Sequence, residues 1–305
     1  MKDQNGSWFR TICQYRGSVI PAVWRRVLLC ALFGTGVSIL HQLGWNLFPA
    51  ILGNVIPTIV LGLLLVFRTN TAYERYWEGR KLWGMMINSV RNLSRQLWVV
   101  VVADTPQERT RKIAALRLLI AFAIATKLYL RQEPVNHELA ALITRQQYEH
   151  LQRVNHPPLK IAFWLEDYLQ QQYRNNKVNI YQLTYLDALV DKLVESLGGC
   201  ERILKTPIPL AYSIHLKQIL LLFCLLLPFQ VVGELELWTG LIVGLISFTL
   251  FGVEEIGTEI ENPFGKDLND LPLDTICATM QRNIEDLIQS PPGSALPMAV
   301  EVPEV

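Results

Sequence analysis

Charged residues are missing from two long stretches of this chain. No Asp, Glu, Lys or Arg occurs in the 41 residues from Val27 to Phe67, and a short polar group at 41–46 divides this stretch into two arms. A helix needs about 20 predominantly apolar residues to cross the hydrocarbon core of a bilayer. The two arms therefore predict a membrane hairpin with spans at about 23–44 and 47–67.

A second pair of uncharged segments lies far downstream, at 218–233 and 237–253, which brings the number of predicted spans to four. The basic residues that flank the spans are Arg25 and Arg26 before the first, Arg68 and Arg75 after the second, and Lys205 and Lys217 before the third. The connecting loops at 41–46 and 234–236 carry neither Lys nor Arg. By the positive-inside rule we expect an integral protein of the cell membrane with both termini in the cytoplasm.

The sequence lacks the patterns typical of an enzyme, a nucleic-acid binder or a metal protein. Its 28 basic and 27 acidic residues leave a net charge of +1, whereas nucleic-acid binding needs a basic face. Its five cysteines, at 13, 30, 200, 224 and 277, lack the close spacing of zinc and redox sites. Nucleophile elbows, phosphate loops and histidines at metal-ligand spacing are also missing. We therefore expect no enzymatic activity, no cofactor and no nucleic-acid partner.

The stretch between the two hairpins, about 70–215, is charged and amphipathic, which predicts a cytoplasmic helical domain. The sequence Asp104-Thr105-Pro106 predicts the end of one helix and the N-cap of the next. Further helices are expected at about 107–131, 159–173 and 178–197. The first contains Arg117, which suits a buried bundle helix better than a membrane span. The last is followed by Gly198 and Gly199, which can break or end it.

The predicted fold class is therefore all-α, with four transmembrane helices and a cytoplasmic helical region in a single domain over 1–290. The remaining segment, 291–305, is expected to be a flexible tail. Two prolines, Pro57 and Pro228, lie within continuous apolar runs. They predict kinks rather than the unwound helices of a secondary transporter.

Bulky apolar residues form a column along the second predicted span. Its members, Val55, Ile59, Leu63 and Phe67, recur at every fourth position and so lie on one helix face. At about 1.5 Å per residue, Ile59 to Phe67 covers roughly 12 Å, enough for a narrow constriction if several copies surround one axis. A membrane span is apolar all round, however, so the periodicity alone favours a surface that faces lipid or a neighbouring helix.

Four short blocks flank the predicted spans in order along the chain. They are Arg16-Gly17-Ser18, Phe67-Arg68-Thr69-Asn70 through Tyr76-Trp77-Glu78 with Trp83-Gly84, Cys200-Glu201-Arg202-Ile203 with Thr206-Pro207-Ile208-Pro209, and Asn262-Pro263-Phe264-Gly265-Lys266-Asp267-Leu268-Asn269-Asp270. Each block is weakly specific alone. Together they cover residues 16–270, and in this order they make the chain resemble the bestrophin family, specifically its prokaryotic branch.

The resemblance implies a homopentamer in the lipid bilayer, with five helical protomers around one ion pathway and the second span lining a hydrophobic neck. The family's neck positions fall on Ile59, Leu63 and Phe67, where rings of apolar side chains can gate by dewetting. The positive edge of the Phe67 ring would favour an anion. A second, cytoplasmic constriction falls by looser matching on Ile180, which fits the core stripe of its own helix equally well.

The acidic stretch after the fourth span, 254–274, is of a kind that is usually a solvated face. Animal bestrophins bind Ca²⁺ at this position, and Asp267 and Asp270 match their pattern. However, Lys266 and Leu268 stand where acidic residues would be needed to hold a hard cation. We therefore expect weak Ca²⁺ binding or none. The alternative role of Asp267 and Asp270, with Asn262 and Pro263, is a capped turn.

The resulting functional hypothesis is an ion channel that passes small anions such as chloride through a pentameric pore. Two alternatives stay open at this point. One is a monovalent cation channel of the same fold, because some bacterial relatives favour cations and the second span contains no charged ring. The other is a non-conducting membrane scaffold, which would need the same helical domain but no pore.

Overall fold

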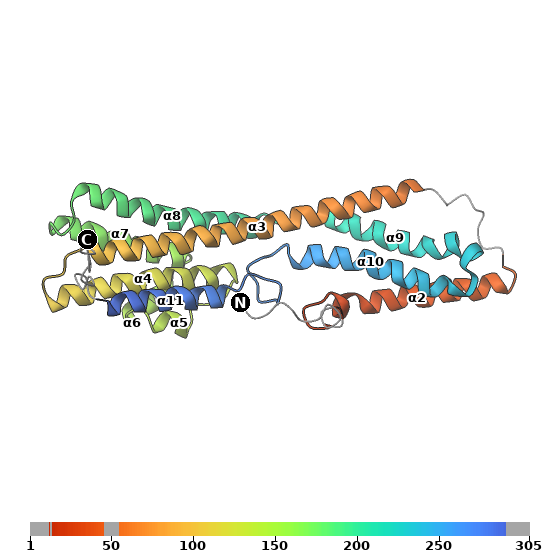
Figure 1. Cartoon of the computed structure of the whole chain (residues 1–305), viewed down its shortest axis with the longest axis horizontal. Coiled ribbons are helices and arrows are strands. Elements are labelled where there is room, and N and C mark those ends of the chain that lie inside the picture. The colour runs from red at the N-terminus through yellow and green to blue at the C-terminus, as the bar shows by residue number, and fades with distance from the viewer. Residues whose placement is uncertain (1–11, 13, 46–54, 291–305) are drawn as a thin grey trace, which may run out of the picture. The chain divides into compact units, whose positions relative to one another are not determined.

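The computed structural model describes residues 12, 14–45 and 55–290. Its elements are α2 (Ile20–Gln42), α3 (Val55–Val100), α4 (Pro106–Leu130), α5 (His137–Ala140), α6 (Arg145–Leu151), α7 (Pro157–Arg174), α8 (Ile180–Lys205), α9 (Leu210–Leu235), the 3₁₀ turn η2 (Glu236–Trp238), α10 (Thr239–Glu259) and α11 (Leu273–Gln289) (Figure 1). Every element within the described residues is helical, which confirms the all-α prediction. The expected start of the second span, 47–54, and the expected tail, 291–305, lie outside the described residues.

The chain divides into two compact units. Unit 1 comprises Met1–Trp77 and Thr206–Asp270, and unit 2 comprises Glu78–Lys205 and Leu271–Val305. The long helix α3 supplies its first part to unit 1 and its second part to unit 2. The expected membrane hairpins fall in unit 1, whereas most of the expected cytoplasmic helices fall in unit 2.

Unit 1 packs α2, the first part of α3, α9 and α10 around an apolar core. The core residues are Val23, Cys30, Leu61, Leu65, Leu216, Leu220, Cys224, Leu227, Val243 and Phe251. By length and composition, the segments Ile20–Gln42 and Leu210–Glu259 are apolar enough to cross a membrane. Only 28% of the most apolar window of each is buried within the chain, so much of this apolar surface faces outward, as in helices surrounded by lipid.

Small residues allow α2 and α10 to approach each other closely. A Cβ atom added to Gly34 would lie 3.2 Å from the Cα atom of Gly240, and one added to Gly240 would lie 2.1 Å from Thr35 Oγ1 and 2.9 Å from the carbonyl oxygen of Ala31. Small residues at helix contacts are the usual means of packing within a bilayer, where van der Waals contact replaces the hydrophobic effect. These glycines therefore set the distance between the first and fourth predicted spans.

Unit 2 is a helical bundle built around α4. A run on α4 from Ala115 to Leu128 is almost entirely buried, and α7, α8 and α11 pack around this helix. Its most apolar window is long enough to cross a membrane, but 78% of that window is buried inside the chain. This burial supports the interpretation of α4 as a bundle helix, with its apolar residues facing neighbouring helices.

The turn between α3 and α4 has the predicted cap and one further feature. Thr105 accepts a hydrogen bond from the backbone N–H of Glu108, whose side chain accepts one from the N–H of Thr105 in return. In addition, the buried Lys112 donates two hydrogen bonds of 2.6 Å, to the carbonyl oxygens of Trp98 and Val101. This ammonium group satisfies the carbonyls that the end of α3 leaves open. Its burial and the nearby Arg109 lower the pKa of Lys112.

One expectation for this region was wrong, and one helix was not predicted. The helix predicted to break or end at Gly198 and Gly199 continues to Lys205. Gly199 serves close packing and does not end the helix, because a Cβ atom at this position would lie only 2.5 Å from Leu82 Cδ2. The helix α11, which was not predicted, follows the acidic stretch and buries the stripe Leu273, Cys277, Met280 and Ile284.

Replacing Gly240 with alanine tests the close contact between α2 and α10. We expect Gly240→Ala to lower stability by about 1–3 kcal/mol, because the added methyl overlaps backbone atoms of α2. Gly36→Ala is the matched control, since its added Cβ meets no atom within 4 Å and should leave stability unchanged or raise it. The measurement is thermal unfolding of the purified protein in detergent. Equal melting temperatures for the two variants would contradict the packing described here.

Candidate ion pathway

The column predicted for the second span lies on an exposed face of α3. Ile59, Leu63 and Phe67 are 55%, 52% and 60% exposed, although all three are large and apolar. On the opposite face Leu61 and Leu65 are 1% and 5% exposed and belong to the core of unit 1. The side chain of Val55, the first member of the column, lies outside the described residues. The three neck candidates therefore share one surface that the protomer itself leaves uncovered.

A buried stripe fixes which face of α3 is turned outward. Leu61, Leu65, Arg68 and Ala72 are all buried, at steps of four, three and four residues. Tyr212 of α9 adds a polar contact, because its hydroxyl donates to the carbonyl oxygen of Leu64 at 3.0 Å. Since this stripe is held against the unit, the residues half a turn away face outward.

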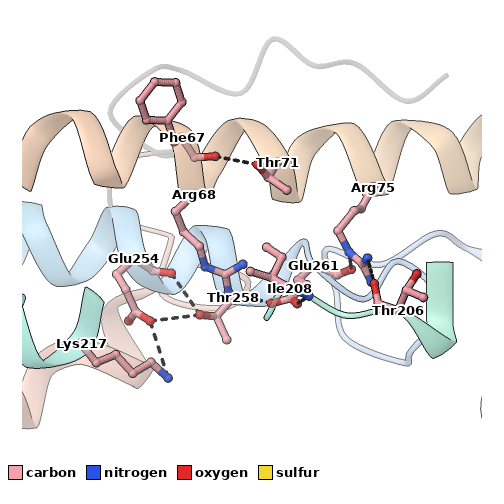
Figure 2. A network of polar contacts seen from close by, with 10 residues as sticks. All are labelled: Phe67, Arg68, Thr71, Arg75, Thr206, Ile208, Lys217, Glu254, Thr258 and Glu261. Atoms are coloured by element: carbon pink, nitrogen blue, oxygen red, sulfur yellow. Dashed lines mark hydrogen bonds and ion pairs between the residues drawn. The ribbon is translucent and has the colours of Figure 1, made fainter. Parts of the chain in front are cut away.

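The unexpected member of this stripe is Arg68, a charged residue with a side chain only 4% exposed. Its Nη2 lies 2.7 Å from Oε2 of Glu261, which follows the end of α10 (Figure 2). Gly257 of α10 packs against it, since a Cβ atom there would meet Arg68 Cγ at 3.5 Å, an ordinary van der Waals distance. Arg68 Nη1 is buried and has no hydrogen-bond partner among the described residues. A buried guanidinium needs a counter-charge, so this pair locks the rotation of α3.

Glu261 joins three segments of unit 1. Besides its ion pair with Arg68, its Oε1 accepts a hydrogen bond of 2.9 Å from the backbone N–H of Ile208. Its backbone carbonyl accepts one of 3.2 Å from Arg75 Nε, and Arg75 also donates to the carbonyl oxygen of Thr206 (Figure 2). The end of α10, the end of the predicted second span and the segment before α9 are thereby held together.

The acidic stretch is thus not wholly a solvated face, as its composition suggested. Glu254 is 2% exposed and its Oε1 accepts a hydrogen bond of 3.2 Å from the hydroxyl of Thr258, while Glu261 is partly buried in the contacts above. The sequence held one signal for Arg68. It follows Leu61 and Leu65 at the spacing of a core stripe, so its burial could have been predicted together with theirs.

Ile180, the candidate for a second constriction, begins α8 in unit 2 and is 49% exposed. The core stripe of α8 begins three residues later, at Leu183, and continues through Leu186, Val190, Leu193 and Leu197. Asn179 and Gln182 fix the helix start, because the side-chain oxygen of each accepts a hydrogen bond of 2.9 Å from the other's backbone N–H. The sequence left open whether Ile180 forms a constriction or belongs to the core stripe of its helix. Its exposure shows that the prediction of a core position within the protomer was wrong.

The two candidate calcium ligands belong to one tight loop. Oδ2 of Asp270 accepts a hydrogen bond of 2.8 Å from the backbone N–H of Asp267, and Oδ1 of Asn262 accepts one of 3.3 Å from that of Phe264. The side-chain amide of Asn269 donates one hydrogen bond of 2.7 Å to the Glu259 carboxylate and one of 3.5 Å to the carbonyl oxygen of Gly17. Gly17 has a φ of +82°, which glycine adopts without strain. In the described part of the chain, no three or more His, Cys, Asp or Glu residues form a group that could hold a metal ion. These contacts form the capped turn that the sequence allowed as the alternative role of Asp267 and Asp270.

Long apolar helices, outward-facing apolar surface and an ion-paired, buried arginine at the end of one span define a helical membrane protein. The chain belongs to the bestrophin family, because it matches the family described as "Bacterial/Fungal Bestrophin protein" over residues 1–286. It is 61% identical to a voltage-dependent anion channel-forming protein of Nostoc sp. over 94% of this chain and 93% of the relative. It is 33% identical to the voltage-dependent anion channel-forming protein YneE of Escherichia coli, over 96% of this chain and 94% of the relative.

Solved structures agree with this assignment. A mutant of a bacterial bestrophin homologue from Klebsiella pneumoniae superimposes with a TM-score of 0.79 at 31% identity, covering 88% of this chain and 99% of that one. A second mutant of the same homologue gives a TM-score of 0.81 at 30% identity. The resemblance noted from the four sequence blocks is therefore confirmed.

Removing the charge of Glu261 tests the role of the buried ion pair. We expect Glu261→Gln to lower stability by roughly 3–5 kcal/mol, because the Arg68 guanidinium then stays buried without a counter-charge. The double variant Arg68→Met/Glu261→Gln should recover much of this loss, because it leaves no unpaired charge buried. Glu149→Gln is the control and should change stability little, because the ion pair of Glu149 with Arg145 is exposed. Thermal unfolding of these variants and of the single variant Arg68→Met measures the coupling. Additive effects of the two single changes would show that the pair is not coupled.

Proposed function

We propose that the protein is an anion channel that works as a homopentamer, with Ile59, Leu63 and Phe67 of α3 lining a hydrophobic neck. The observation that carries this proposal is the exposure of this apolar column on the first part of α3. Its relatives of 61% and 33% identity are named as anion channel-forming proteins, which supports conduction of anions over cations. Chloride is the small anion that we propose as the physiological ion, and the cell membrane as the site.

A neck of this kind would act through hydration rather than through fixed charge. Rings of Ile59 and Leu63 side chains cannot replace the water molecules around an ion, so a narrow apolar passage resists conduction unless it is wide enough to stay wet. Arg68 is the nearest charged residue along α3, but its side chain is turned into the unit and paired with Glu261. The remaining local preference would come from Phe67, whose ring edge carries positive quadrupole character.

We also propose that Ile180 contributes a second constriction. Its exposed side chain sits at the first turn of α8, which Asn179 and Gln182 cap rigidly. In an assembly around one axis, such an exposed apolar side chain could meet its counterparts from other copies, and a ring of apolar side chains can restrict an ion. The role of Ile180 can be separated from that of the neck, because the two sites lie on different helices.

Substitution within the column tests the neck. We expect Leu63→Ala to raise the current roughly five-fold, since lowering a barrier by about 1 kcal/mol has that effect on a rate. Leu245→Ala is the control, because Leu245 is a leucine as exposed as Leu63 but lies on another span, α10, and should leave the current unchanged. The measurement is current through the purified, reconstituted protein in planar bilayers under asymmetric KCl.

The reversal potential in the same experiment decides between the candidate functions. A reversal near the chloride potential supports the anion channel. A reversal near the potassium potential would keep the pore but replace the proposed selectivity by that of a cation channel. No current from wild type or Leu63→Ala, in preparations shown to be pentameric, would favour the non-conducting scaffold.

Calcium is not expected to control this channel. The Asp270 carboxylate caps the N–H of Asp267, and Lys266 adds a positive charge beside them. We therefore expect equal currents with calcium present and with a chelator, and no change of current for Asp267→Asn. A current that falls when calcium is chelated, and does so only when Asp267 is intact, would contradict this expectation.

A further inference from the structure

Unit 1 contains a groove that neither the proposed pore nor the family assignment explains. It has a volume of about 490 Å³ and lies among α2, α9 and α10. Its lining consists of Arg26, Leu29, Cys30 and Phe33 of α2, Lys217, Leu220, Leu221 and Leu225 of α9, and Phe251 and Glu254 of α10. The neck candidates on α3 do not line it, so this groove is separate from the exposed column.

The charged residues of the groove gather at one end. Along α2 Arg26 precedes Leu29 and Phe33, and along α9 Lys217 precedes Leu221 and Leu225. Glu254 lies near the end of α10, and its carboxylate is 3.7 Å from both Arg26 Nη1 and Lys217 Nζ. Figure 2 shows Lys217 beside Glu254 and Thr258. The groove therefore has a charged mouth and an apolar body.

The length of the groove matches part of one lipid leaflet. Phe33 lies seven positions after Arg26, and Leu225 eight positions after Lys217, which at about 1.5 Å per residue gives roughly 10–12 Å of helix axis. Half of a hydrocarbon core is about 15 Å thick. An acyl chain in the groove would thus extend through most of one leaflet, with its head group level with the two cations.

The exposed charges at the mouth favour an anionic head group. Two cations, Arg26 and Lys217, face two carboxylates, Glu254 of the lining and the neighbouring Glu255. The carboxylate side chains are only 3% and 17% exposed, whereas those of Arg26 and Lys217 are half-exposed, so the accessible charges are the cations. Arg26 has a closer partner in Glu255, at 3.2 Å, while Lys217 lies beyond hydrogen-bond distance of Glu254. The positive ends of both side chains can therefore also contact a phosphate. Basic pockets between membrane helices are a general means of binding anionic lipid head groups.

We propose that this groove binds an anionic phospholipid, with acyl carbons against Leu29, Phe33 and Leu221 and the phosphate between Arg26 and Lys217. Leu29 and Leu221 are exposed apolar residues within the predicted membrane region, so a lipid chain covers surface that the protomer leaves open. The buried Glu254 lies 3.7 Å from each of the two cations and attracts both toward the mouth. This lipid site does not depend on ion conduction. It would be present whether the protein is a channel or a non-conducting scaffold.

Native mass spectrometry of the full-length protein in neutral detergent tests this site. The probes are phosphatidylglycerol and phosphatidylcholine with identical acyl chains. We expect wild type to prefer phosphatidylglycerol, and Arg26→Gln and Lys217→Gln each to weaken its binding about five-fold, the effect typical of one basic residue near an anionic lipid. Neither change should alter binding of phosphatidylcholine.

The matched control is Arg25→Gln. Arg25 neighbours Arg26 in sequence and is exposed, but it contacts the Trp24 ring and does not line the groove. It should leave binding of both lipids unchanged. A fourth variant, Leu221→Trp, fills the apolar body without altering any charge and should reduce binding of both lipids. Because Leu221 is exposed, this variant is expected to fold.

Three results would overturn the proposal. Equal binding of the two lipids by wild type would remove the anionic preference. An equal loss for Arg25→Gln, Arg26→Gln and Lys217→Gln would show that surface charge in general attracts the lipid. No binding by an assembled oligomer, with Leu221→Trp weakening the assembly itself, would show that a second copy of the chain covers the groove.

Discussion

The ion pair between Arg68 and Glu261 is the interaction that orients the first part of α3. A guanidinium in an apolar environment is costly without a counter-charge, so the helix can adopt only rotations that bring Arg68 to Glu261. With Arg68, Leu61 and Leu65 directed inward, Ile59, Leu63 and Phe67 are directed outward. A single polar contact at the end of the span thus determines which apolar residues of α3 face outward.

The two units satisfy their polar groups in different ways. In unit 2, Lys112 and the Thr105 cap complete the end of one helix and the start of the next, within a short stretch of sequence. In unit 1, the contacts of Glu261 connect segments that are distant in sequence. Close helix contact at Gly34 and Gly240 then supplies packing where lipid on the outside removes most of the hydrophobic driving force between helices.

The sequence was sufficient for the fold class and for most helices, because long uncharged runs and the Thr105 cap have few alternative interpretations. It was insufficient wherever a residue type serves two purposes. Glycine can end a helix, or it can allow a side chain of another helix to pack closely. Gly199 has the second role, because Leu82 packs against it. Acidic residues are usually solvated, yet Glu254 and Glu261 are held by partners far away in sequence. Ile180 fitted both a core and a surface position, and only its exposure decided against the core.

The distance in sequence between Arg68 and Glu261 has a consequence for biogenesis. The partners are 193 residues apart, so α3 emerges from the ribosome long before its counter-charge exists. At the usual 5–20 residues per second, the interval is roughly 10–40 s. During that time the N-terminal hairpin carries an arginine at its end that has no Glu261 to bind, while the local contacts of Lys112 can already form. The outward face of the second span is therefore settled only after the last span has been synthesised.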